Sequence, residues 1–143
     1  MIERMSAKEY NKKHGTFFKE EKRNKYGAKK VELDGKIFDS TSEGTLYYEL
    51  KLQEKQGLIA AVETQVKESF YLNECFICDY YVDFLITHND GSLEYIEHKG
   101  KATDAWRIKW KLLMAKYNDD PNMKCTINWL KPKYKFNKLK KKL

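Results

Sequence analysis

The sequence predicts an α/β fold whose elements follow the order αβββαβ around one mixed sheet. Three β-rich runs stand between two stretches with helical spacing, and a final alternating run follows the second helix. The chain has 143 residues, of which 41% are hydrophobic. That composition indicates a folded chain with one core of ordinary size.

The N-terminal part is predicted to be an arm followed by a hairpin. Residues 1–28 are polar and basic, which favours an extended or partly helical arm. Asp34-Gly35 separates two short β-rich segments over 31–38, and this dipeptide suits a type I′ turn. We therefore expect a basic arm over residues 1–30, the main domain over 31–130 and a Lys-rich tail over 131–143.

The first helix is predicted over about 42–56. Ser40, Thr41 and Ser42 offer N-caps before it, and Gly57 ends it. Strands are predicted over 64–73, 76–87 and 93–99, a second helix over 103–118 and a last strand over 124–130.

The second helix carries two apolar stripes on nearly opposite sides. One must pack on the sheet, and the other needs a cover, either a terminal arm or a second subunit. The first stripe holds Trp106, Trp110, Leu113 and Tyr117, and the second holds Ile108, Leu112 and Ala115.

Positive charge gathers at both ends of the chain, although the net charge is only +7. Residues 1–30 carry ten Lys or Arg against four acids, and residues 131–143 carry seven Lys and no acid. The second helix and the residues just before it are also basic. We expect DNA as the partner, bound through Lys101, Arg107, Lys109, Lys111, Lys131, Lys133 and Lys135. The alternatives for the tail are an anionic membrane surface, which Tyr134 and Phe136 would suit, and a solubilising frayed end.

The expected cellular location rests on the apolar segments and the cysteines of the sequence. It has no apolar run of the roughly 20 residues that span a bilayer and no apolar stretch of a signal peptide near its start. Three cysteines are an odd number, which argues against a disulfide framework. We expect a soluble protein of a reducing cytoplasm, with no membrane partner.

The chemistry is predicted to lie on the hairpin that joins the second and third of these strands. Glu97 and Lys99 share one face of a strand, because side chains alternate. If Asn89-Asp90-Gly91 is a three-residue loop with Gly91 in the left-handed region, His88 pairs with Ser92 and Asp83 lies opposite Glu97. A two-residue turn would instead put His98 opposite Asp83.

Two neighbouring carboxylates repel each other unless a cation lies between them. Mg²⁺ binds oxygen ligands and keeps several waters, so Asp83, Glu97 and the backbone carbonyl of His98 make a partial shell, with Mn²⁺ expected to substitute. Lys99 would orient the attacking water and neutralise charge on a phosphate. The pattern predicts metal-assisted phosphodiester hydrolysis.

Each of these residues also has a structural interpretation. Asp83, Glu97 and Lys99 could form a cross-strand salt bridge. Ser40-x-x-Glu43 fits a capping box, although Glu43 also heads the helix face that meets the sheet and could point its carboxylate to the metal. Cys75-x-x-Cys78 could be half of a zinc site, or two ordinary strand cysteines.

The motifs together resemble the PD-(D/E)XK nuclease superfamily. The resemblance lies in Asp83 and the Glu97-His98-Lys99 strand, between a helix with Glu43 and a basic helix. With Asn24–Lys30, Phe38-Asp39-Ser40 and Tyr81–Phe84, residues 24–118 look like small phage endonuclease-like proteins and are similar to phage endonuclease I, which resolves branched DNA. Val82 stands where the superfamily name has Pro, which supplies no ligand.

The resemblance implies a restriction-endonuclease-like core and a role for each site residue. Asp83 and Glu97 would bind the metal, Glu43 would be a further carboxylate in or beside the shell, and Lys99 would be the catalytic lysine. It also implies a homodimer and a phage resolvase of four-way (Holliday) junctions working in a bacterial cytoplasm. The same site would serve a structure-insensitive nickase or nuclease, and a non-catalytic DNA-binding accessory protein is the other alternative.

Overall fold

The computed structural model describes residues 19–23 and 29–129. The chain divides into two compact units, Met1–Lys55 and Gln56–Leu143. The predicted tail at 131–143 and most of the predicted arm at 1–30 lie outside the described residues.

The first unit is a small antiparallel sheet with one helix. Its strands are β1 (Lys19–Arg23), β2 (Lys29–Leu33) and β3 (Lys36–Phe38), paired in that order. Asp34 and Gly35 have φ values of +52° and +72°, both in the left-handed region, which fits the predicted type I′ turn. β1 adds a strand that the sequence pattern did not reveal, inside the segment predicted to be an arm.

Helix α2 (Thr41–Lys55) follows β3 directly, within one residue of the predicted bounds at each end. The Ser40 hydroxyl caps it by accepting the backbone N–H of Glu43 at 3.1 Å. Tyr47 is buried, and its ring centroid lies 4.9 Å from that of Phe38 at the end of β3. The hydrophobic spacing therefore marks the side of α2 that packs on its own sheet.

The second unit holds the remaining elements. They are β4 (Ala61–Leu72), β5 (Cys75–Thr87), β6 (Leu93–Lys99), α3 (Asp104–Lys116) and β7 (Met123–Trp129). The sheet order is β4-β5-β6-β7, with antiparallel pairing up to β6 and parallel pairing between β6 and β7. Helix α3 makes the crossover that parallel pairing requires. The prediction of an α/β fold with a mixed sheet is confirmed.

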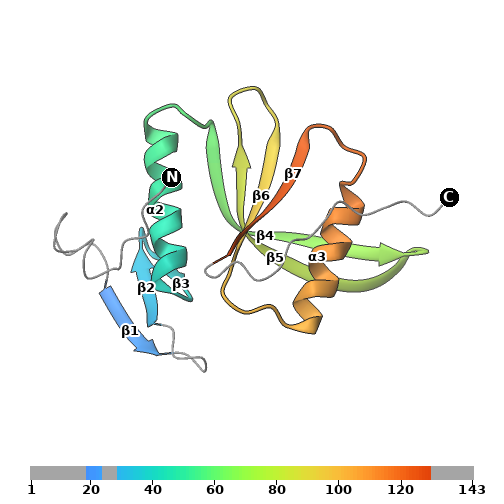
Figure 1. The fold of residues 1–143 in the computed structure, drawn as a ribbon, viewed down its shortest axis with the longest axis horizontal. Coiled ribbons are helices and arrows are strands. Elements are labelled where there is room, and N and C mark those ends of the chain that lie inside the picture. The colour runs from blue at the N-terminus through green and yellow to red at the C-terminus, as the bar shows by residue number, and fades with distance from the viewer. Residues whose placement is uncertain (1–18, 24–28, 130–143) are drawn as a thin grey trace. The chain divides into compact units, whose positions relative to one another are not determined.

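The hairpin of β4 and β5 extends well beyond its neighbours, and α3 packs on it (Figure 1). β6 pairs with β5 only from Thr87 to Phe84, whereas β4 follows β5 along almost its whole length. Seven buried residues form the core between sheet and helix: Phe70, Tyr80, Val82, Tyr95, Trp106, Trp110 and Leu113.

One stripe of α3 faces this core, as predicted. Trp106, Trp110 and Leu113 are buried, whereas Ile108 on the opposite side is 62% exposed. Leu112 is half-buried against the core, so the second stripe is only partly covered within the second unit. A cover for Ile108, whether an arm or a second subunit, stays a prediction.

A buried carboxylate ties the C-terminal end of α3 to the sheet. Glu68 of β4 accepts hydrogen bonds from the hydroxyls of Tyr95 and Tyr117 at 2.5 and 2.6 Å, and its other oxygen pairs with Lys116 at 2.5 Å. Burial raises the pKa of this carboxyl, but the hydrogen bonds from Lys116, Tyr117 and Tyr95 outweigh burial, so the net pKa is lowered. Glu68 is therefore a structural anion rather than an open site.

Among the residues that the structure describes, neither helix has the length and apolar character needed to cross a bilayer.

Candidate active site

The loop between β5 and β6 adopts the predicted form. The N–H of His88 donates to the Ser92 carbonyl at 2.9 Å, and the N–H of Gly91 donates to the His88 carbonyl at 2.9 Å. Gly91 has a φ of +85°, in the left-handed region that favours glycine. Asp90 also accepts the Ser92 N–H at 2.8 Å, which stabilises the reversal.

This loop fixes the register that brings two carboxylates together. Thr87 pairs with Leu93 and Phe84 with Ile96, and one further step sets Asp83 opposite Glu97. Oδ2 of Asp83 accepts the N–H of His98 at 2.9 Å, and Oε2 of Glu97 accepts the N–H of Asp83 at 3.3 Å. The predicted juxtaposition of Asp83 and Glu97 is confirmed.

Glu97 is the most buried member of the site, with 4% of its surface exposed. Its Oε1 accepts the indole N–H of Trp106 at 3.1 Å, and the same N–H lies 3.0 Å from the Tyr80 hydroxyl. Burial, followed by the negative charge of Asp83, raises the pKa of Glu97 to about 7, while Lys99 acts in the opposite direction. A buried carboxylate with a nearby like charge is an arrangement that a cation would stabilise.

Lys99 lies beside Glu97 at the end of β6. Its Nζ is 3.6 Å from Oε1 of Glu97 and 5.0 Å from the centre of the Trp106 ring. The side chain keeps 24% of its surface exposed. The ammonium is thus held by a carboxylate and an aromatic face, yet a substrate in solvent can reach it.

Gln65 of β4 joins the site, although the sequence analysis missed it. Its Nε2 donates to Oδ1 of Asp83 at 3.2 Å, and its backbone φ is +52°. Its neighbours pair regularly, Thr64 with Phe84 and Val66 with Val82. A single glutamine in a β-rich run carries no sequence signal, because the contact depends on the register between β4 and β5.

Glu43 belongs to the first unit, on the first turn of α2, and is 8% exposed. Its backbone N–H makes the capping bond to Ser40, which is half of the predicted capping box. Its predicted place in or beside a metal shell with Asp83 stays a prediction.

His98 takes part in the site through its backbone, since its N–H holds Asp83. Its ring Nδ1 lies 3.3 Å from the side-chain amide of Asn128 on β7. The imidazole therefore meets the next strand, and the backbone carbonyl remains the group through which we expect His98 to contribute to a metal shell.

The expected Mg²⁺ stays a prediction, for which Asp83 and Glu97 offer oxygen donors of the type that Mg²⁺ prefers. Within residues 19–23 and 29–129, no group of three or more His, Cys, Asp or Glu side chains could hold a metal ion. Mg²⁺ in enzymes commonly uses only one or two carboxylates, with waters and substrate phosphates completing its shell. Asp83 and Glu97 supply that number.

The same finding gives no support to a zinc site at the cysteines. Cys75, Cys78 and Cys125 are free thiols, and Cys75 is exposed near the tip of the β4–β5 hairpin. Burial raises the pKa of Cys125 to about 11, which disfavours the thiolate that binds zinc. These cysteines are described best as ordinary strand residues.

The predicted DNA-binding residues in α3 and just before it differ in the contacts that they make. Lys101 and Lys111 are exposed, while Arg107 pairs with Asp104 at 3.3 Å. Nζ of Lys109 donates to the backbone carbonyl of Asp79 on β5 at 2.9 Å, which ties it to the sheet. Lys131, Lys133 and Lys135 lie outside the described residues.

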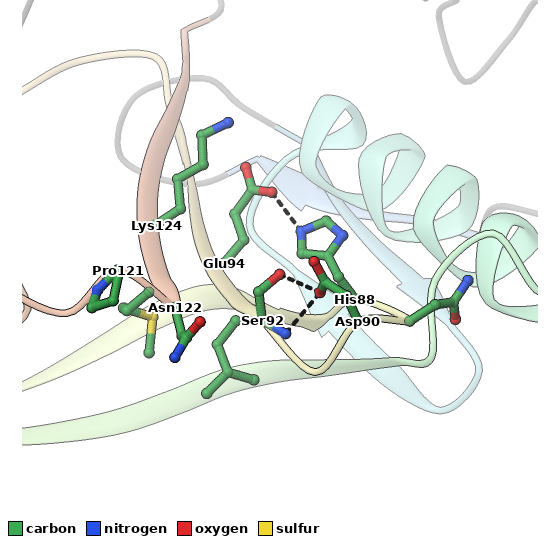
Figure 2. A pocket seen from close by; sticks show the side chains of 10 residues that line it. His88, Asp90, Ser92, Glu94, Pro121, Asn122 and Lys124 are labelled. Carbon is green, nitrogen blue, oxygen red and sulfur yellow. Dashed lines mark hydrogen bonds and ion pairs between the residues drawn. The ribbon is translucent and has the colours of Figure 1, made fainter.

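A pocket of about 510 Å³ lies elsewhere, between the β5–β6 loop and the residues before β7 (Figure 2). Its polar side chains bond one another: His88 lies 2.9 Å from Oε2 of Glu94, whose other oxygen accepts the Thr126 hydroxyl at 2.8 Å. Glu94 stands near the start of β6, whereas Glu97 and Lys99 stand near its end. The pocket is therefore separate from the carboxylate pair.

Comparisons with known proteins identify a family without an activity. The model of a family described as "Protein of unknown function (DUF1064)" matches residues 23–138. No curated protein and no solved structure matches the chain. The match includes Glu43 and the whole β5–β6 hairpin.

Proposed function

We propose that this chain, which belongs to the DUF1064 family, is a metal-dependent endonuclease that hydrolyses phosphodiester bonds in DNA. One observation carries the proposal: Asp83 and Glu97 lie opposite each other beside Lys99, near the end of strand β6. An exposed salt bridge on a solvated face would not need a carboxylate that is 4% exposed and held by an indole.

Each residue has a role that its surroundings support. Asp83 and Glu97 would hold Mg²⁺ or Mn²⁺ through their carboxylates, with the His98 carbonyl nearby. The bound ion would supply Lewis-acid polarisation of the scissile phosphate. Lys99 would orient the attacking water and neutralise charge that builds on the phosphate, because its ammonium is anchored but partly exposed.

The substrate is proposed from charge and from resemblance. Lys101, just before α3, and Lys111, on α3, are exposed, so both can contact a phosphate backbone. The likeness to PD-(D/E)XK nucleases supports a restriction-endonuclease-like core, and the likeness to phage endonuclease I supports branched DNA, a homodimer and a phage protein of the bacterial cytoplasm.

The test is cleavage of a synthetic four-way junction and a matched linear duplex, with Mg²⁺, Mn²⁺ or chelator. Wild type should cut with metal, and Asp83→Asn and Lys99→Ala should bind DNA without cutting. Asp79→Asn is the matched control, because Asp79 lies on the same strand and bonds Ser69 and Lys67 instead.

Each outcome separates the candidate functions. Cutting of the junction alone indicates a resolvase, and equal cutting of both substrates indicates a structure-insensitive nuclease. Tight binding without cutting by the wild type would overturn the nuclease proposal in favour of an accessory protein.

A further inference from the structure

Gln65 has a backbone conformation that its position in the fold does not require. Among the described residues, four that are not glycine have a positive φ: Asp34, Gln65, Asn73 and Glu74. Asp34, Asn73 and Glu74 form the tips of tight hairpins, where such angles reverse the chain. Gln65 instead stands inside strand β4, where an extended backbone is the normal conformation.

The irregularity occurs opposite Asp83. Thr64 pairs with Phe84 and Val66 with Val82, so the position between them faces Asp83 across the strand pair. Gln65 is exposed, and therefore core packing does not explain its conformation. Its side-chain amide reaches Oδ1 of Asp83 at 3.2 Å.

The amide completes a set of contacts that fixes the Asp83 carboxylate. Oδ2 already accepts the N–H of His98 at 2.9 Å from the β6 side. Gln65 holds the other oxygen from the β4 side, so the carboxylate is held from both neighbouring strands. A carboxylate fixed in this way presents its remaining lone pairs in a constant direction.

We propose that Gln65 is a positioning residue for Asp83, and that its left-handed backbone is retained because it brings the amide to that carboxylate. This inference rests on the proposed nuclease function. Strained backbone at a functional site is a recognised pattern, and here the strain coincides with a contact to the proposed metal ligand.

The critical variant is Gln65→Gly, since glycine accepts a φ of +52° without strain but has no amide. We expect the melting temperature to stay equal or rise, and kcat for DNA cleavage to fall by about tenfold to a hundredfold. The KM for DNA should stay unchanged, and the Mn²⁺ concentration for half-maximal rate should increase. A left-handed backbone with a purely structural role would not shift the metal dependence.

Two further variants sharpen the result. Asn73→Gly relieves a positive φ in the distant hairpin tip and should leave cleavage unchanged. Gln65→Glu keeps the length of the side chain but replaces the donor with a second acceptor beside Asp83, so kcat should fall although the backbone stays left-handed.

The proposal fails separately from the nuclease function. If wild type cleaves DNA and Gln65→Gly cleaves with the same kcat and Mn²⁺ dependence, Gln65 has no positioning role while the nuclease stands. If wild type cleaves nothing but Mn²⁺ raises its melting temperature, equal Mn²⁺ shifts in both proteins overturn the Gln65 role. If wild type neither cleaves nor responds to Mn²⁺, both proposals fall.

Discussion

The indole N–H of Trp106 donates to Oε1 of Glu97 at 3.1 Å, so the first turn of α3 reaches the end of strand β6. The Thr103 hydroxyl caps the helix by accepting the Trp106 N–H at 3.2 Å, which fixes where that turn begins. The ring also lies 5.0 Å from the Lys99 ammonium. Helix α3 is therefore part of the site as well as part of the core.

The Trp106→Phe variant tests this contact, because phenylalanine keeps an aromatic ring but lacks the donor. Loss of one buried hydrogen bond should cost about 1–2 kcal/mol of stability. With Glu97 less well held, kcat should fall by about tenfold or more. The measurements are urea denaturation and the rate of DNA cleavage under saturating Mg²⁺.

Trp110→Phe is the matched control. Trp110 is 1% exposed and stacks on Trp106 at 5.9 Å, so this variant loses core packing in the same helix. It should be destabilised without losing kcat. Equal losses of kcat in the two variants would mean that Trp106 acts through packing alone.

The raised pKa of Glu97 predicts how stability depends on pH in the absence of divalent metal. The folded protein holds a proton on Glu97 up to a pH near 7, while the unfolded chain releases it near 4.5. The Glu97 contribution is therefore complete below about pH 4.5 and is lost as pH rises through 7. The loss should be roughly 3 kcal/mol.

Glu97→Gln should remove this part of the pH profile, because glutamine does not titrate. Added Mg²⁺ should stabilise wild type at pH 8 and leave Glu97→Gln nearly unaffected. Thermal melts between pH 5 and 8, with Mg²⁺ or chelator, measure both effects. A wild type that is more stable at pH 8 than at pH 5 in chelator, by an amount that Glu97→Gln abolishes, would contradict the assignment.

For Glu68 we expect the opposite dependence of stability on pH, because the pKa of its carboxyl is lowered in the folded protein. Its contribution is complete above the pKa of the unfolded chain and is lost as pH falls through the folded value. Glu68→Gln should lower stability by about 1–3 kcal/mol at pH 7, since Lys116 loses its charged partner. Urea denaturation should show the gap between variant and wild type narrowing in acid.

Glu63 is exposed on the same strand and provides the control. Glu63→Gln should neither lower stability at pH 7 nor change how stability depends on pH. Glu68 holds the C-terminal end of α3 to the sheet and does not lie in the proposed site. Glu68→Gln should therefore still cleave DNA at temperatures where it is folded. A folded Glu68→Gln without cleavage would mean that the C-terminal end of α3 also positions the site.

Local signals predicted the α/β class, the mixed sheet and the carboxylate pair. Asp34-Gly35 and Asn89-Asp90-Gly91 each determine a turn through backbone conformation, and the second turn sets the register of every pair up to Asp83. The helical spacing of Trp106, Trp110 and Leu113 likewise identified the face that is buried. These predictions need only neighbours in sequence.

Contacts between residues that are far apart in the sequence could not be predicted. Gln65 meets Asp83 only because the register between β4 and β5 places the two residues across from each other, and no pattern around Gln65 marks a left-handed residue. β1 was missed because its residues, KEEKR, lack the apolar alternation that identifies a strand. The contact between Trp106 and Glu97 depends on how α3 docks, which hydrophobic spacing alone does not determine.

The last prediction concerns the DNA contacts that we propose for α3. Each lysine that contacts a phosphate adds about 0.9 to the slope of log affinity against log salt. Lys111→Ala should therefore lower that slope by about 1, because Lys111 is exposed, and removal of residues 131–143 should lower it further.

Lys109→Ala is the control. The Lys109 ammonium donates to the Asp79 carbonyl, so stability should fall while the salt slope changes little. Fluorescence anisotropy with a labelled duplex between 50 and 200 mM salt, the range over which such contacts are read, measures the slopes. A larger change for Lys109→Ala than for Lys111→Ala would place the DNA on the sheet side of α3.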